Sequence, residues 1–171
     1  MINFQSIKRA LLTTSVVAML VGFLSGCESV DNDRIPPFNV YIPFNSQAEW
    51  ITYGVSGAAD YRIFHKNTRM PAGYPWSVQS ASGYGGVLLC TDLSADPVAY
   101  DLSCPVECKQ DIRIQVDTEA FNARCPVCGS TYDIFGANHG APLSGPAAER
   151  HYGLQVYPVI SNGATYRLVT R

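Results

Sequence analysis

The sequence lacks the short motifs that mark several large enzyme classes. It contains no Gly-x-Ser-x-Gly, no His-Glu-x-x-His and no phosphate-binding loop, so the signatures of many hydrolases, zinc proteases and nucleotide-binding proteins are missing. It has only three histidines in 171 residues and a formal net charge of −2. Because nucleic-acid binding requires a basic surface, this charge argues against a nucleic-acid partner.

The N-terminal region has the pattern of an export signal. Lys8 and Arg9 precede residues 10–24, an almost unbroken apolar run without charge that is too short to span a bilayer comfortably. The run closes on Leu24-Ser25-Gly26-Cys27, which resembles the lipobox of bacterial lipoproteins. We therefore expect Cys27 to carry a lipid that anchors the protein to the membrane without a transmembrane helix. An ordinary secretory signal with an incidental cysteine is the alternative.

Cleavage before the cysteine divides the chain into three parts. Residues 1–26 are the expected signal peptide, and their removal leaves 145 residues with ten basic and fourteen acidic side chains, a net charge of −4. Residues 27–37 are acidic and polar and end in two prolines, so we expect a lipidated tether that is extended and solvated. Its acidic stretch resembles the surface-export signal of some bacterial lipoproteins, and a plain linker is the alternative. Residues 38–171 are long enough for one domain with its own core.

The composition and pattern of residues 38–171 are typical of β structure. Short segments rich in Val, Ile, Tyr and Thr are separated by Gly, Pro, Asn and Asp. In one of them Ile112, Ile114 and Val116 alternate with polar residues, the period of a strand with one buried face. The pattern predicts an all-β sandwich or small barrel. The expected strands are Val40–Ile42, Trp50–Gly54, Tyr61–Phe64, Gly86–Cys90, Val98–Asp101, Ile112–Asp117, Thr131–Ile134, Leu154–Val159 and Thr165–Val169.

One segment favours a helix instead. Ser46–Ile51 offers Ser46 as an N-cap and Glu49 three residues later, the pairing found at helix starts. Residues 65–85 are polar and rich in glycine and proline, so we expect an ordered surface loop or hairpin in which Tyr74 and Trp76 cover the core.

Four of the six cysteines form two close pairs. Cys104 and Cys108 make the first pair, and Cys125 and Cys128 follow after sixteen residues. This spacing is typical of a tetrahedral thiolate site, because each pair fits one turn and the two turns can face each other. Considered as spacing alone, it favours zinc. The remaining cysteine, Cys90, lies in an apolar strand and is expected to act as a small buried hydrophobe.

The residues around the pairs resemble a Rieske domain. The resemblance depends on three segments: Val98–Pro105, Cys125–Asp133 and Leu143–Ala147. Their order and spacing match the two cluster-binding loops, the Gly-Ser-x-Tyr segment and the Gly-Pro loop of that family. The resemblance covers roughly residues 86–160. It implies an antiparallel β-sandwich with the two cysteine loops side by side at one end.

Individual roles follow from the resemblance by position. Cys104 and Cys125 match the two thiolate ligands of one iron. Ser130 and Tyr132 match hydroxyls that donate hydrogen bonds to cluster sulfurs, and Gly145-Pro146 matches the loop that covers the cluster.

The histidine ligands of the family have no counterpart. Val106 occupies the position of the first histidine and Cys128 that of the second, so the His₂Cys₂ site of a Rieske centre cannot form. Cys108, two residues beyond the first position, replaces that ligand only if the loop is remodelled. His139 follows the second loop and is expected to be a turn residue rather than a ligand or base. The three histidines, all outside the loops, are His65, His139 and His151.

Three states of the four cysteines remain open. A [2Fe–2S] cluster or a zinc ion would use all four as ligands. A domain without metal would instead carry disulfides, for which the resemblance implies the pairs Cys104–Cys125 and Cys108–Cys128. An exported compartment favours disulfides.

We therefore expect a lipoprotein of the bacterial envelope, in the outer membrane on its periplasmic or surface side, with a Rieske-like domain. With an iron–sulfur cluster it would transfer electrons to an unknown redox or envelope partner. The alternative is a degenerate Rieske-like structural or interaction module without a cluster, held by disulfides or zinc. We do not expect an enzyme, because a Rieske oxygenase needs a further domain with a mononuclear iron, for which 145 residues leave no room.

Overall fold

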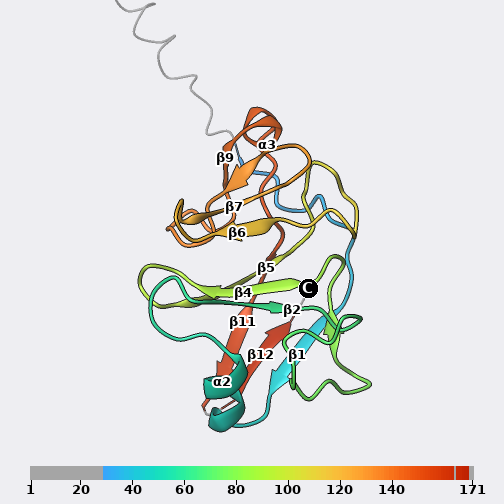
Figure 1. Ribbon diagram of the computed structural model, residues 1–171, viewed down its shortest axis with the longest axis vertical. Helices are drawn as coiled ribbons and strands as arrows, with labels where there is room; N and C mark the ends of the chain where they lie inside the picture. Colours follow the sequence, from blue (N-terminus) through green and yellow to red (C-terminus); the bar gives the residue numbers. More distant parts are fainter. Residues whose placement is uncertain (1–28, 164, 170–171) are drawn as a thin grey trace, which may run out of the picture.

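Strands dominate the part of the chain that the structure, a computed structural model, describes: residues 29–163 and 165–169. Two short helices, α2 (Gln47–Tyr53) and α3 (Pro146–Glu149), interrupt them (Figure 1). The strands are β1 (Val40–Phe44), β2 (Tyr61–Phe64), β3 (Ala81–Ser82), β4 (Val87–Thr91), β5 (Pro97–Asp101), β6 (Gln115–Asp117), β7 (Asn122–Arg124), β8 (Thr131–Tyr132), β9 (Pro142–Ser144), β10 (Val156–Tyr157), β11 (Val159–Asn162) and β12 (Thr165–Val169).

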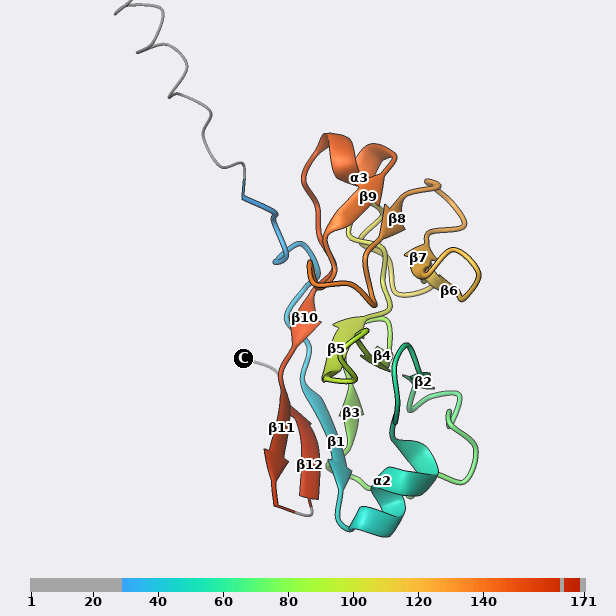
Figure 2. The same ribbon diagram turned by 90° about the vertical axis from the view of Figure 1, so that its left-hand side faces the viewer.

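The strands form three antiparallel sheets of four strands each. One sheet has the order β11-β12-β1-β3, the second β10-β5-β4-β2 and the third β6-β7-β8-β9. The third sheet lies above the other two in Figures 1 and 2, together with α3. The prediction of an all-β fold is confirmed.

The second sheet is buried on both faces and separates two hydrophobic cores. In β4, Val87 and Leu89 face a core shared with the first sheet, whereas Leu88 and Cys90 face a core shared with the third. All five side chains of β4 are buried, because a strand covered on both sides needs apolar residues at every position. The first two sheets thus form a sandwich, and the third sheet caps the outer face of the second.

Several sequence-based boundaries need correction. The strand predicted for Thr165–Val169 coincides with β12, and Tyr61–Phe64 coincides with β2. The strand predicted for Ile112–Asp117 is shorter, since only its last three residues form β6, although Ile114 is 2% exposed and belongs to the core. The strand predicted for Trp50–Gly54 is wrong, because most of this segment lies in α2.

Capping contacts at the start of α2 explain why this segment forms a helix although its later residues favour β structure. The Ser46 hydroxyl accepts a hydrogen bond from the backbone N–H of Glu49 at 3.2 Å, as the sequence predicts. The Glu49 carboxylate reaches back to the backbone N–H of Asn45 at 2.7 Å. These contacts satisfy backbone donors that a short helix would otherwise expose.

The described part of the expected tether packs on the domain. Asp31 forms a parallel bridge with Tyr152, and the Arg34 guanidinium lies 4.2 Å from the centre of the Tyr152 ring. Most tether side chains are exposed, as expected, but Ile35 is 3% exposed, so full solvation is wrong at this position. Residues 1–26 and Cys27, the expected signal peptide and lipid attachment site, lie outside the described residues.

Within residues 29–163 and 165–169, no helix has the length and apolar character needed to cross a bilayer.

Candidate metal centre

The first cysteine loop leaves β5 and returns toward β6. The backbone N–H of Cys104 donates to Ile112 O at 3.0 Å, and the N–H of Cys108 donates to Cys104 O at 2.8 Å, which closes a turn around Pro105 and Val106. A bridge between Ser103 and Arg113 fixes the base of the loop. The Cys104 side chain is completely buried in this turn.

The second cysteine loop joins β7 to β8. The N–H of Cys125 donates to Ser130 O at 2.9 Å, and the N–H of Gly129 donates back to Cys125 O at 3.1 Å. Gly129 has φ +73°, a conformation that glycine adopts without strain and that turns the chain directly after Cys128. Cys125 is buried and Cys128 is half-buried.

The two loops bring three sulfurs together. The Sγ atoms of Cys104, Cys125 and Cys128 all lie within 4.8 Å of one another, and those of Cys104 and Cys128 are 3.6 Å apart. With metal–sulfur bonds of about 2.3 Å, thiolates at the corners of a regular tetrahedron lie about 3.8 Å apart. The donor atoms and their separation therefore fit a thiolate-bound metal ion.

The two hydroxyls singled out by the sequence contact these sulfurs. The Tyr132 hydroxyl lies 3.4 Å from Cys104 Sγ, and the Ser130 hydroxyl lies 3.2 Å from Cys128 Sγ. Ser130 Oγ also accepts a hydrogen bond from the N–H of Ala147 at the start of α3, at 3.0 Å. Such contacts orient metal ligands and adjust their basicity.

The Gly-Pro loop covers the same serine. Gly145 has φ +73°, and a Cβ atom added there would lie 3.0 Å from the Cα of Ser130. Only glycine lets the loop approach this closely, so the predicted covering role of Gly145-Pro146 agrees with its position next to Ser130.

The thiols of the group differ in acidity. Burial raises the pKa of Cys104 to about 12, although a hydrogen bond with Tyr132 opposes the shift. For Cys128 burial also acts upward, but hydrogen bonds from the Ser130 hydroxyl and backbone and from the other two thiols outweigh it, and the pKa is lowered. Cys128 is therefore the sulfur of this pair that becomes a thiolate more readily.

The fourth predicted ligand lies outside the group. Cys108 Sγ lies 3.1 Å from Pro105 O and 3.6 Å from Arg34 O instead of facing the other sulfurs. All five cysteines of the described region carry free thiols, including both members of each disulfide pair expected from the sequence. The structure thus brings together three of the four predicted ligands.

Two histidines have other partners. His139 Nε2 lies 3.6 Å from a carboxylate oxygen of Asp92, a partner that the sequence did not suggest. His65 Nε2 lies 3.2 Å from the guanidinium of Arg113. Burial and, to a smaller extent, the positive charge of Arg113 lower the pKa of His65. None of the histidines in the described region belongs to the sulfur group. Val106, at the position of the first family histidine, is partly buried against the core.

Cys90 behaves as predicted. It is completely buried, and its thiol donates to Ile134 O at 3.3 Å. Burial raises its pKa, so it stays protonated and takes no part in the group.

Sequence analysis missed the role of Asp101, which braces the first cysteine loop. Its buried carboxylate accepts hydrogen bonds from the N–H of Ser103 at 2.7 Å, the N–H groups of Tyr84 and Gly85 at 3.0 and 3.1 Å, and the Tyr157 hydroxyl at 2.8 Å. An acidic residue at the end of an apolar strand, three positions before a ligand cysteine, is the only sequence signal of this role.

Comparison of the chain with protein-family models, with curated proteins and with solved structures gives no match. The geometry of the three sulfurs and their hydrogen-bond partners is therefore the basis from which a function is inferred.

Proposed function

We propose that this protein is an envelope electron-transfer protein that holds a [2Fe–2S] cluster on cysteine ligands, in a Rieske-like domain anchored by a lipid on Cys27. The convergence of Cys104, Cys125 and Cys128 within 4.8 Å carries the proposal, because three thiols from two separate loops meet where the resemblance requires ligands. The Tyr132 and Ser130 hydroxyls support it, since each contacts a sulfur as the same resemblance predicts.

Each residue has a defined task in this proposal. Cys104, Cys125 and Cys128 would hold the cluster, which accepts and releases one electron when bound. Tyr132 and Ser130 would donate hydrogen bonds to the ligand sulfurs and so stabilise negative charge on them. Full burial of Cys104 and Cys125 keeps water away, whereas the half-buried Cys128 offers the shortest route for an electron to the surface.

Zinc is the second candidate, and one distance favours it. The 3.6 Å between the Cys104 and Cys128 sulfurs is close to the edge of a single tetrahedral site. Ligands of two different irons must lie farther apart, since bridging sulfides separate the metals. A [2Fe–2S] cluster would therefore require the two loops to open slightly.

Metal analysis of anaerobically purified protein separates these candidates. The proposal expects visible colour and equal amounts of iron and sulfide, both lost in Cys104→Ser and Cys125→Ser and retained in Cys90→Ala. Cys90 is the matched control, because it is as buried as the two ligands but lies outside the group. Colourless protein with one zinc per chain would support the second candidate. Protein without metal, with its cysteines paired in a thiol count, would contradict both.

A further inference from the structure

The tether contacts the one cysteine that the sulfur group leaves out. The Cys108 thiol donates hydrogen bonds to Arg34 O of the tether, at 3.6 Å, and to Pro105 O, at 3.1 Å. Its backbone has φ +50°, a left-handed conformation that is uncommon for residues with a side chain. The outward orientation of this thiol therefore coincides with a strained backbone and depends partly on the tether.

A second contact holds the same loop next to the end of the tether, at the first residue of the domain. The ring of Phe38 packs against the ring of Tyr84 with centroids 5.2 Å apart. The Tyr84 hydroxyl donates a hydrogen bond to Cys108 O at 3.1 Å. The thiol of Cys108 thus contacts the tether, and its carbonyl is held by a tyrosine that packs on the residue directly after the tether.

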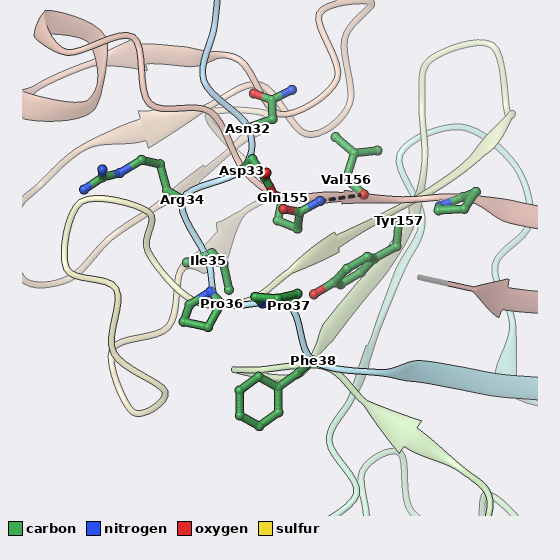
Figure 3. Close-up of a pocket in the computed structure, with 11 residues that line it drawn as sticks. Asn32, Asp33, Arg34, Ile35, Pro36, Pro37, Phe38, Gln155, Val156 and Tyr157 are labelled. Carbon is green, nitrogen blue, oxygen red and sulfur yellow. Dashed lines mark hydrogen bonds between the residues drawn. The ribbon is translucent and has the colours of Figure 1, made fainter. Parts of the chain in front are cut away.

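The tether is also held by one backbone bridge, by the Arg34 guanidinium 4.2 Å from the centre of the Tyr152 ring and by one buried side chain. The N–H of Asp31 donates to His151 O at 2.7 Å and the N–H of Gly153 donates to Asp31 O at 2.9 Å, and Ile35 is buried. Residues 32–38 form one side of a groove of about 850 Å³, and Gln155–Pro158 form the other (Figure 3).

Two prolines limit the backbone pairing between the tether and the neighbouring segment of the domain. Pro36 and Pro37 line the groove and lack N–H groups, so they cannot donate to the neighbouring chain and extend the bridge that begins at Asp31. A segment with so few backbone bonds opens at a low free-energy cost.

The sulfur group lacks what Cys108 can supply. Three thiolates leave a tetrahedral site one ligand short. Cys108 is the nearest remaining cysteine in the sequence, four residues from Cys104, and its N–H already closes the turn on Cys104 O at 2.8 Å. The left-handed backbone of Cys108, at φ +50°, is a conformation that a movement of this loop would release.

We propose that Cys108 is the fourth ligand of the metal centre in a second conformation of the first loop, and that the docked tether holds it in the outward conformation. On binding, the thiol gives its proton to solvent, its sulfur bonds to the metal, and the contacts with Arg34 O and Pro105 O break. This inference rests on the proposed metal centre. Because coupling between two sites is reciprocal, metal binding must loosen the tether by the same factor by which tether docking weakens metal binding.

Trypsin cleavage after Arg34 reports tether docking directly. The mature chain 27–171 with Cys27→Ser is incubated with or without Zn²⁺, and release of the peptide 27–34 is followed by mass spectrometry. Bound zinc is measured in the same samples. Cys108→Ser is compared with the parent chain, and Cys108→Ala serves as a second variant with the same loss of a ligand. For each variant the cleavage rate with zinc is divided by the cleavage rate without zinc. This ratio corrects for any effect of the substitution on the docking of the tether.

We expect zinc to accelerate cleavage after Arg34 about fivefold or more in the parent chain, the lower end of typical coupling between sites. In both Cys108 variants zinc should leave the rate unchanged. An unchanged or slower rate in zinc-loaded parent protein, or equal acceleration in the variants, would overturn the inference while the metal centre stands. Failure of the parent chain to bind zinc would also overturn it, whereas the metal centre is judged separately by the iron and sulfide analysis.

Discussion

The Tyr132 hydroxyl lies 3.4 Å from Cys104 Sγ although the two residues are 28 positions apart in the chain. Burial raises the pKa of Tyr132 above its ordinary value, so the hydroxyl keeps its proton and is able to donate a hydrogen bond to a thiolate at Cys104. This contact links the end of β8 to the first cysteine loop. It therefore joins the two halves of the candidate centre and places a hydrogen-bond donor on one of its ligands.

Tyr132→Phe should lower the reduction potential of the loaded protein. The hydroxyl stabilises negative charge on Cys104, and this charge is greater after reduction. We expect a drop of about 60 mV, which for one electron corresponds to about 1.4 kcal/mol, close to the value of a hydrogen bond to a charged group. Voltammetry measures it. Tyr100→Phe is the control, because its hydroxyl is equally buried but lies 3.5 Å from Ile134 O. Equal potentials in the two variants would contradict the role of Tyr132.

Gly145→Ala should weaken metal retention as well as stability. The backbone of Gly145, with φ +73° and ψ −166°, alone costs about 1–3 kcal/mol for alanine. The added Cβ would also press on Ser130, which contacts Cys128. Gly57→Ala is the matched control, since Gly57 has φ +77° with nothing within 4 Å of the added atom. Both variants should lose unfolding free energy in denaturant, but only Gly145→Ala should lose metal to a chelator faster.

Asp101→Asn should destabilise the fold. The carboxylate accepts from three backbone N–H groups and from the Tyr157 hydroxyl, and an amide places a donor where an acceptor is needed. We expect a loss of about 3 kcal/mol in unfolding free energy, typical of a broken buried charged network. Tyr157→Phe, which removes one of these donors, should cost about 1 kcal/mol. Urea denaturation measures both, and equal losses would refute a central role for Asp101.

The sequence predicts much of the site because its contacts arise within turns. The spacing of the cysteine pairs predicts that the two loops meet, and the resemblance to a Rieske domain implies that Ser130 and Tyr132 lie beside the sulfurs. They do not reveal the orientation of Cys108, because that depends on a contact with Arg34, 74 positions earlier.

The fold was less predictable where contacts with neighbouring segments decide which secondary structure a segment adopts. The helix predicted from Ser46 continues through most of Trp50–Gly54, which was predicted as a strand, because capping contacts satisfy its first turn. Strands β7 and β9 were missed, because each has only three residues, too few to show a pattern, and is ordered by pairing with its neighbours.

Cys27→Ser should block maturation of the lipoprotein. A lipobox without its cysteine has no thiol to acylate, so the precursor should stay uncleaved and take up no labelled fatty acid. Cys90→Ala, which alters a buried cysteine away from the signal, should be processed normally. Normal cleavage and membrane retention of Cys27→Ser would refute the lipid anchor.

The reduction potential and its pH dependence test the electron-transfer proposal most directly. A Rieske centre has two neutral imidazoles on one iron and a potential of roughly −150 to +300 mV, whereas clusters with only cysteine ligands lie near about −400 mV. Thiolates in place of imidazoles add negative charge, which favours the oxidised cluster. With no ligand histidine to titrate, the potential should also change little between neutral and alkaline pH.

The decisive measurement is voltammetry of the reconstituted protein over that pH range. We predict a reversible one-electron signal near −400 mV that is almost independent of pH. A positive potential that falls as pH rises would mean that a histidine, most directly His139 after release from Asp92, ligates the cluster, and the assignment of the cysteines would be wrong. The absence of any signal from protein that retains its metal would contradict electron transfer itself.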